Sequence, residues 1–227
     1  AVPTTTVLRK SSLEVIVGAD GSLDVRDLRN GRVWKSSRAQ PGLVPTSITK
    51  TADSITLIGL DLRTAQDRTV VVVPKGDEVR VTLKGGGPLK ELTYPAGFRT
   101  TAGSTLVLPM NEGIGYPVED PAVPEWYLVA YGGHGICMPW WGVVDRGAVA
   151  MTILETADDA GVRIRRQDGL AVAGPAFEGQ KGLFGYERRL ILKFIEKGNH
   201  VQMAKAYRAY VKSKGRLVTL AQKRKRV

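Results

Sequence analysis

Hydrophobic and polar residues alternate along the first part of the chain with the two-residue period of β-strands. The alternating segments are 13–17, 23–25 and 33–34. Asp20-Gly21 and Asn30-Gly31 lie between them, and Asp-Gly and Asn-Gly pairs favour the tight turns that join antiparallel strands. The pattern therefore predicts a meander of short hairpins.

More strands are predicted by runs rich in β-branched residues and bounded by Gly, Pro, Asn or Asp. These runs are 54–62, 69–73, 78–84, 105–108, 126–131, 135–140, 148–155 and 161–166, and a long last strand is expected at 183–195. No internal repeat is visible. So many strands without intervening helices predict an all-β, antiparallel sandwich and not a parallel α/β sheet.

After residue 197 the spacing of apolar residues changes from the period of a strand to that of a helix. Asn199 is a suitable N-cap, Gly215 a suitable stop, and a short second helix is expected over 217–225. The apolar positions at helical spacing are Met203, Tyr207, Tyr210 and Val211. We therefore divide the chain into a β-domain, residues 1–197, and a C-terminal linker helix, residues 198–227.

Composition and length agree with a globular β-protein. The 227 residues are 43% hydrophobic and 24% charged, which suffices for one large domain, and no apolar run is long enough to cross a bilayer. The single Cys137 excludes an internal disulfide, and we expect a small buried side chain there. A chain that starts at Ala1 without a leader is compatible with signal processing, so we expect a secreted or periplasmic protein.

The net charge of +11 comes almost entirely from the C-terminal segment. Residues 198–227 contain nine Lys and Arg and no acid, so residues 1–197 carry only +2. No stacking aromatic residues accompany the terminal basic run. A basic tail attracts phosphates, but specific nucleic-acid recognition needs more than charge, so we expect no specific nucleic-acid partner.

The stretch 106–156 holds three of the four Trp residues and the only Cys. Aromatic rings supply contact area at little entropic cost, so this stretch is a candidate ligand-facing or domain-facing edge. Trp140 and Trp141 are adjacent on a predicted strand, so at least one should enter the core while the other is free to face a ligand or another domain. The same alternation applies to Trp126 and Tyr127.

Some carboxylates and one histidine are candidates for catalysis. Glu112 with Glu119, Asp120 or Glu125 could form a glycosidase pair, which needs two carboxyl groups flanking a sugar bond. His134 lies in a glycine-rich turn that could present a general base, although a lone turn histidine is more often solvated or structural.

Other chemical signatures are missing from the sequence. Two distant His and one Cys match no metal-site spacing, the glycine clusters do not open a helix, and no serine lies in a hydrolase elbow. We therefore expect no metal, no cofactor and no catalytic residue in this chain.

Four segments together resemble a known group of proteins. They are 13–37 (LEVIVGADGSLDVRDLRNGRVWKSS), 105–120 (TLVLPMNEGIGYPVED), 132–164 (GGHGICMPWWGVVDRGAVAMTILETADDAGVRI) and 204–223 (AKAYRAYVKSKGRLVTLAQK). They resemble the N-terminal galactose-mutarotase-like β-supersandwich and linker helix of large glycoside hydrolases, including those related to endo-α-N-acetylgalactosaminidases.

The resemblance implies a non-catalytic role. In such enzymes the sandwich precedes a (β/α)8 barrel that carries the catalytic carboxylates, and the linker helix packs between them. Stand-alone mutarotases of this fold use two His and a Glu in the sheet concavity. With only His134 and His200 available, that constellation cannot be filled here.

We therefore expect an N-terminal domain of a carbohydrate-active enzyme, with carbohydrate and a downstream catalytic domain as its partners. Residues expected on its carbohydrate or interdomain surface are Asn111, Glu112, Trp126, His134, Trp140 and Trp141. One alternative is a stand-alone carbohydrate-binding module that uses Trp140 or Trp141 and polar neighbours such as Asn111 and Glu112. A weaker alternative is a small sugar epimerase or hydrolase with His134 or Glu112 as base.

Overall fold

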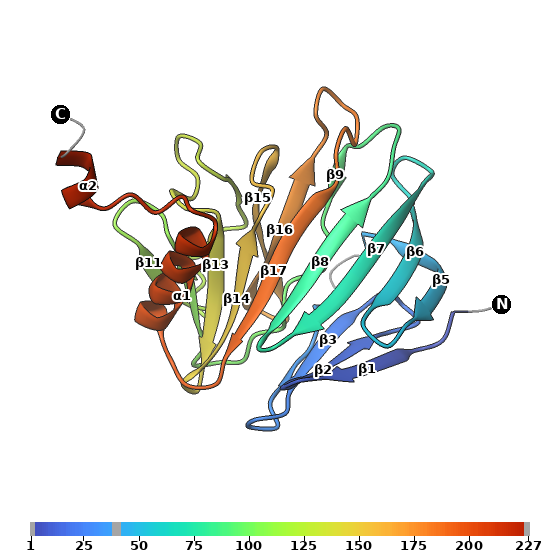
Figure 1. The fold of residues 1–227 in the computed structure, drawn as a ribbon, viewed down its shortest axis with the longest axis horizontal. Helices are drawn as coiled ribbons and strands as arrows, with labels where there is room; N and C mark the ends of the chain where they lie inside the picture. The colour runs from blue at the N-terminus through green and yellow to red at the C-terminus, as the bar shows by residue number, and fades with distance from the viewer. Residues whose placement is uncertain (1–2, 38–41, 225–227) are drawn as a thin grey trace.

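The computed structural model describes residues 3–37 and 42–224, which form three antiparallel β-sheets and two helices (Figure 1). The first sheet has the order β1-β2-β3-β4, with strands Thr6–Lys10, Leu13–Val17, Leu23–Asp27 and Val33–Trp34. Gly21 and Gly31 have φ of +83° and +72° in the turns before β3 and β4. Glycine adopts this left-handed backbone without a side-chain clash, so the predicted hairpins form where expected.

A nine-stranded sheet is the largest element. Its order is β11 (Ile114–Pro117), β10 (Thr105–Leu108), β13 (Trp140–Asp145), β14 (Ala148–Leu154), β17 (Arg188–Ile195), β8 (Glu78–Lys84), β7 (Gln66–Lys75), β6 (Ile55–Asp61), β5 (Val44–Lys50). A third sheet has the order β12 (Tyr127–Val129), β15 (Ala160–Gln167), β16 (Leu170–Glu178), β9 (Glu91–Leu92).

The main core lies against one face of the nine-stranded sheet. It combines fully buried side chains from all three sheets, such as Val15 of the first, Val72 of the second and Val162 of the third. The two four-stranded sheets therefore form the second layer of a sandwich, with the nine-stranded sheet as the first. This arrangement confirms the predicted antiparallel β-supersandwich.

Helix α1 (His200–Ser213) covers part of the opposite face of the nine-stranded sheet, over β13 and β14 (Figure 1). Asn199 caps it: its side chain accepts from the Val201 N–H at 2.9 Å, and the Gln202 side chain accepts from the Asn199 N–H at 3.0 Å. Met203 is fully buried against the sheet. A Cβ at Gly142 would lie 3.0 Å from the Met203 methyl group, so glycine there permits the close packing of helix on sheet.

Helix α2 (Leu220–Arg224) follows and has no buried residue. It starts later than the predicted 217–225 segment, and residue 225 lies outside the described residues. Neither helix in the described part of the chain is long and apolar enough to span a membrane. The division at residue 197 stays a prediction.

Several local expectations were wrong. Residues 135–139 form bends with an isolated β-bridge at Ile136. The strand begins only at Trp140, since Pro139 lacks an N–H donor for a sheet ladder. Cys137 is exposed in this segment, where we expected a buried side chain. β16 was missed because Gly174 and Pro175 interrupt its apolar run. The strand predicted over 183–195 begins only at Arg188.

Candidate functional site

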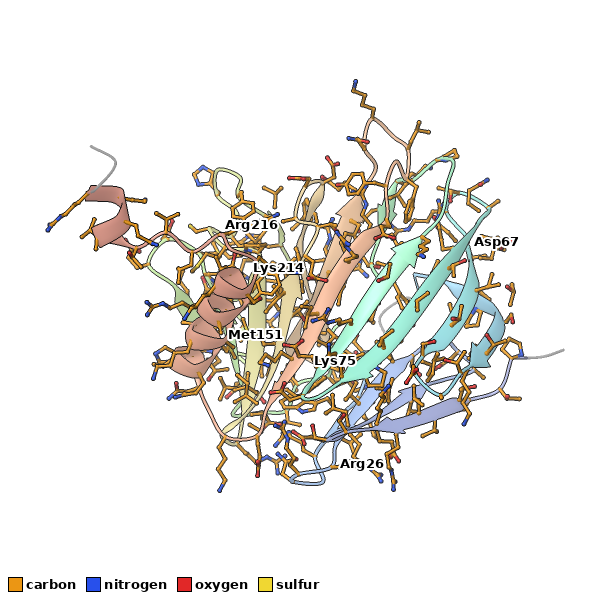
Figure 2. All side chains as sticks on the ribbon, viewed as in Figure 1. Arg26, Asp67, Lys75, Met151, Lys214 and Arg216 are labelled. Carbon is orange, nitrogen blue, oxygen red and sulfur yellow. The ribbon has the colours of Figure 1, made fainter. Side chains whose placement is uncertain are left out.

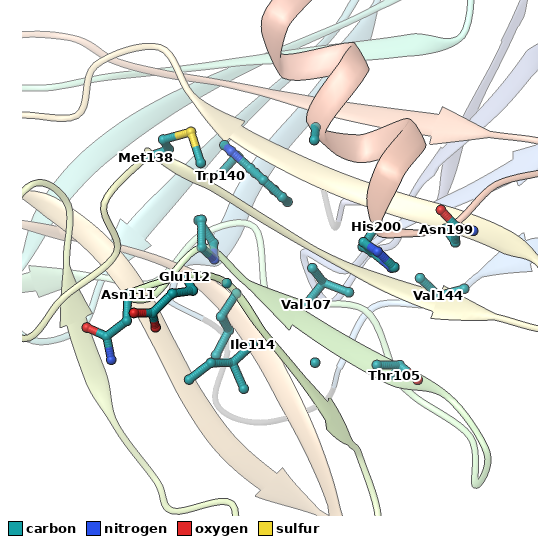
Figure 3. Close-up of a pocket in the computed structure, with 15 residues that line it drawn as sticks. Thr105, Val107, Asn111, Glu112, Ile114, Met138, Trp140, Val144, Asn199 and His200 are labelled. Carbon is teal, nitrogen blue, oxygen red and sulfur yellow. The ribbon is translucent and has the colours of Figure 1, made fainter.

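A pocket of about 640 Å³ opens between the β10–β11 hairpin, strand β13 and the first turns of α1 (Figure 3). We call it the Trp140 pocket. It is lined by Thr105, Val107, Leu108, Pro109, Asn111, Glu112, Gly113, Ile114, Gly115, Met138, Trp140, Val144, Asn199, His200 and Ala204. Its walls are mainly apolar, with polar side chains at the ends, which is the usual composition of a small-molecule site.

The β10–β11 turn carries the first polar group. The Gly113 N–H donates to the Met110 carbonyl at 2.6 Å, and Asn111 has φ of +47°. Asparagine tolerates this left-handed backbone better than most residues, so the short turn forms there. It exposes Asn111 and Glu112 at one end of the pocket in the view of Figure 3.

Trp140 forms the aromatic wall. It is 4% exposed, and its ring centroid lies 6.2 Å from that of Tyr207 on α1. Within the described residues its indole N–H is buried without an acceptor. A buried donor without a partner costs about 1–3 kcal/mol, so an acceptor that reached this atom would stabilise the site. Trp141 points the other way into the main core and is 2% exposed.

The N-terminus of α1 supplies the opposite end of the pocket. Asn199 is already engaged as the helix cap, whereas His200 is exposed. Both lie apart from Asn111 and Glu112 in Figure 3, with Val107 and Ile114 between. The pocket therefore presents one carboxylate, one imidazole and one indole ring around an apolar centre.

The structure brings together three of the six predicted surface residues: Asn111, Glu112 and Trp140 line the pocket. Trp126 is half-buried against the main core, Trp141 is inside that core, and His134 is exposed in the turn before β13. Those three do not line the pocket.

The other candidate carboxylates do not line the pocket either. Glu119 accepts from the Gly103 N–H at 3.2 and 3.3 Å, and Asp120 accepts from the Ala122 N–H at 2.8 Å. These bonds stabilise surface turns. Glu112 is therefore the single acid of the pocket lining.

A second cavity, of about 500 Å³, was not predicted. It lies at the C-terminal end of α1 and is lined among others by Tyr131, Glu155, Tyr186, Tyr207, Tyr210 and Lys214; we call it the tyrosine groove. Only the helical spacing of Tyr207 and Tyr210 pointed to it. Burial and the neighbouring Glu155 raise the pKa of Tyr210 to about 12. Burial and the nearby Tyr131 also raise the pKa of Tyr207.

Within 3–37 and 42–224, no group of three or more His, Cys, Asp or Glu side chains is arranged to hold a metal ion.

Comparison with known proteins was informative only at the level of structure. No family model matches the sequence, and no curated protein sequence matches it. The ligand-free α-N-acetylgalactosaminidase NagBb from Bifidobacterium bifidum superposes with a TM-score of 0.79 at 21% identity, covering 96% of this chain and 40% of that chain. A galactose mutarotase related enzyme from Lactobacillus acidophilus superposes with a TM-score of 0.51 at 8% identity, covering 86% and 99%. The chain has the galactose-mutarotase-like fold.

This fold also occurs in an α-mannosidase from Enterococcus faecalis V583, with a TM-score of 0.55, 11% identity, and coverage of 90% of this chain and 31% of that chain. The chain thus spans 40% of the length of the bifidobacterial enzyme and 31% of the mannosidase. In both enzymes the fold of this chain is one part of a longer polypeptide. The residues that the 96% match leaves out are fewer than the 14 residues of α1. The match to the bifidobacterial enzyme therefore includes part of this helix as well as the sandwich.

Proposed function

We propose that this chain is a non-catalytic β-sandwich domain of a carbohydrate-active enzyme. In this role it braces a catalytic domain of the same polypeptide, and its Trp140 pocket contributes to carbohydrate binding. The observation that carries the proposal is the shared fold of sandwich and helix, which accounts for 40% of an α-N-acetylgalactosaminidase.

The helical segment supports the bracing role. α1 buries Met203 against the sheet, yet most of its other residues are exposed, and α2 buries none. Exposed apolar side chains, Val218 and Leu220, follow α1 at 40% and 67% exposure. Burying these two side chains against another domain would stabilise such a contact.

The arrangement of carboxylates in the Trp140 pocket supports the proposal that this domain is non-catalytic. Glycoside hydrolysis uses two carboxyl groups on either side of the sugar bond, whereas Glu112 is the single acid of the Trp140 pocket. His200 lines this pocket and His134 does not, so the pocket does not assemble a histidine pair.

The lining of the Trp140 pocket supports carbohydrate binding, because an aromatic wall with a few polar groups suits a sugar ring. One solved form of the bifidobacterial enzyme is a GalNAc complex, so N-acetylgalactosamine is the first probe. We expect saturable shifts of the Glu112 and Trp140 amide signals in an NMR titration of the 227-residue chain. Glu112→Gln should weaken binding by about tenfold, because a hydrogen bond to a charged acceptor contributes about 1.5–3 kcal/mol.

Glu125→Gln is the matched control, since Glu125 is exposed and does not line the pocket. Its affinity should equal that of the unmodified chain. Equal affinities for Glu112→Gln and the unmodified chain would contradict the assignment of the pocket. Turnover of aryl glycosides that Glu112→Gln abolishes would contradict the non-catalytic role.

A further inference from the structure

The tyrosine groove is separate from the Trp140 pocket, because no residue lines both cavities. It is built from the end of β14, the loops at Tyr131 and Tyr186, and the last turns of α1. Its lining is more polar than that of the Trp140 pocket and includes two acids and two cations, Glu155, Asp158, Lys214 and Arg216. Lys214 and Arg216 lie near one another at the end of α1 (Figure 2).

Tyrosine rings give the groove an extended aromatic surface. The Tyr207 and Tyr210 ring centroids are 6.0 Å apart with an interplanar angle of 30°. The Tyr186 ring is fixed by its hydroxyl, which donates to the Asp158 carbonyl at 2.7 Å. Two aromatic rings side by side on one helix offer a surface that can contact the C–H face of a pyranose.

Tyr131 is held in an unusual conformation. The residue is 63% exposed and its φ is +59°, a left-handed backbone that a bulky residue rarely adopts. The tight turn behind it requires Gly135, where a Cβ would lie 1.9 Å from the Val129 carbonyl oxygen. Burial does not explain a strained, exposed aromatic residue, and such residues cluster at binding sites.

Glu155 supplies an oriented acceptor. Its side chain is 11% exposed, and its Oε1 accepts from the Tyr210 hydroxyl at 3.4 Å and pairs with Lys214 Nζ at 3.0 Å. Within the described residues, Oε2 carries no hydrogen bond. A fixed carboxylate with a free oxygen beside aromatic faces is suited to accept hydrogen bonds from sugar hydroxyls.

We propose that the tyrosine groove is a second saccharide site, specific for neutral pyranoses. The two acids and two cations of its lining balance, so the groove offers no net charge to attract an anionic ligand. Hydroxyl groups of the sugar bond Glu155 and Lys214, and its ring packs on Tyr131 or on the Tyr207–Tyr210 surface. A volume of about 500 Å³ is within the range of small-ligand sites.

The test is an NMR titration of the ¹⁵N-labelled chain with galactose, N-acetylgalactosamine, glucose and mannose, each alone. At least one sugar should cause saturable shifts of the Tyr131 and Glu155 amides. Tyr131→Gly and Glu155→Gln should each weaken that binding at least tenfold. Tyr131→Gly should also leave the melting temperature unchanged or higher, because glycine relieves the left-handed backbone, whereas a merely structural tyrosine would lower it on removal.

Lys181→Gly is the matched control for the first variant, since Lys181 is also exposed at positive φ, +50°, and does not line the groove. Glu187→Gln is the control for the second, because Glu187 is exposed and pairs only at the surface with Arg189. Both controls should bind as the unmodified chain does. The proposal would be overturned if both groove variants bound the sugar as tightly as the unmodified chain does. It would also be overturned if none of the four sugars caused saturable shifts in the groove. Shifts at Glu112 and Trp140 report the other pocket separately.

Discussion

Replacing Arg68 with alanine should lower the free energy of unfolding by about 3–5 kcal/mol, the usual cost of breaking a buried ion pair. The Arg68 side chain is fully buried, and its guanidinium donates to the carbonyls of Gly86 and Pro88 and to Thr64 Oγ1 at 3.2 Å. It lies 3.5 Å from Asp61, whose side chain is 2% exposed. The variant leaves the buried Asp61 carboxylate without its ion-pair partner and the two carbonyls without the guanidinium donor. Urea denaturation measures the loss.

Arg80→Ala is the control for this experiment. Arg80 lies on the neighbouring strand β8, but its side chain is 45% exposed and reaches Glu78 only at 3.8 Å. Surface pairs of this kind contribute about 0–1 kcal/mol, so the control should remain close to the unmodified chain. An Arg68→Ala variant as stable as Arg80→Ala would show that Arg68 does not stabilise the turn at Thr64 or the segment 86–88.

Met203→Ala should have the second large effect, a loss of about 2–5 kcal/mol. Met203 is the fully buried residue of α1 and belongs to a cluster with Trp140, Met151 and Ile191 on the outer face of the nine-stranded sheet. Truncation leaves a cavity under the helix that the sheet cannot close. Figure 2 shows Met151 beside α1, on the strand that the helix covers.

Val201→Ala is the matched helix control, because Val201 is 41% exposed on the same helix. Its effect should stay within about 0.5 kcal/mol, the range of ordinary surface substitutions. A Met203→Ala variant that unfolds at the same denaturant concentration as Val201→Ala would show that α1 is not fixed to the sandwich by this contact.

Local signals in the sequence predicted much of the fold. Turn pairs such as Asn30-Gly31 located the hairpins, and the Asn199 cap marked the start of α1 to the residue. Strand β16 was not predicted because it contains Gly174, which is typical of a turn. Glycine is needed there for a tertiary contact, since a Cβ would lie 2.7 Å from the Gly97 nitrogen. Sequence periodicity does not reveal such close approaches between distant segments.

The candidate sites were harder to predict than the fold, because they too depend on contacts between segments that are far apart in the sequence. Strand alternation correctly separated Trp140 from Trp141, but it could not show that α1 covers the outward ring. The tyrosine groove joins Tyr131 and Glu155 to the last turns of α1, and these residues come from elements far apart in the sequence. No local pattern links them, so only the three-dimensional arrangement brings them together.

The coding sequence downstream of the Val227 codon tests the central claim most directly. The proposed role as a bracing domain predicts that the reading frame continues into a catalytic domain with two carboxylates placed for glycoside hydrolysis. Its α1 segment would then connect the sandwich to that domain. A stop codon directly after Val227 would contradict the bracing role and leave a stand-alone carbohydrate-binding protein as the better account.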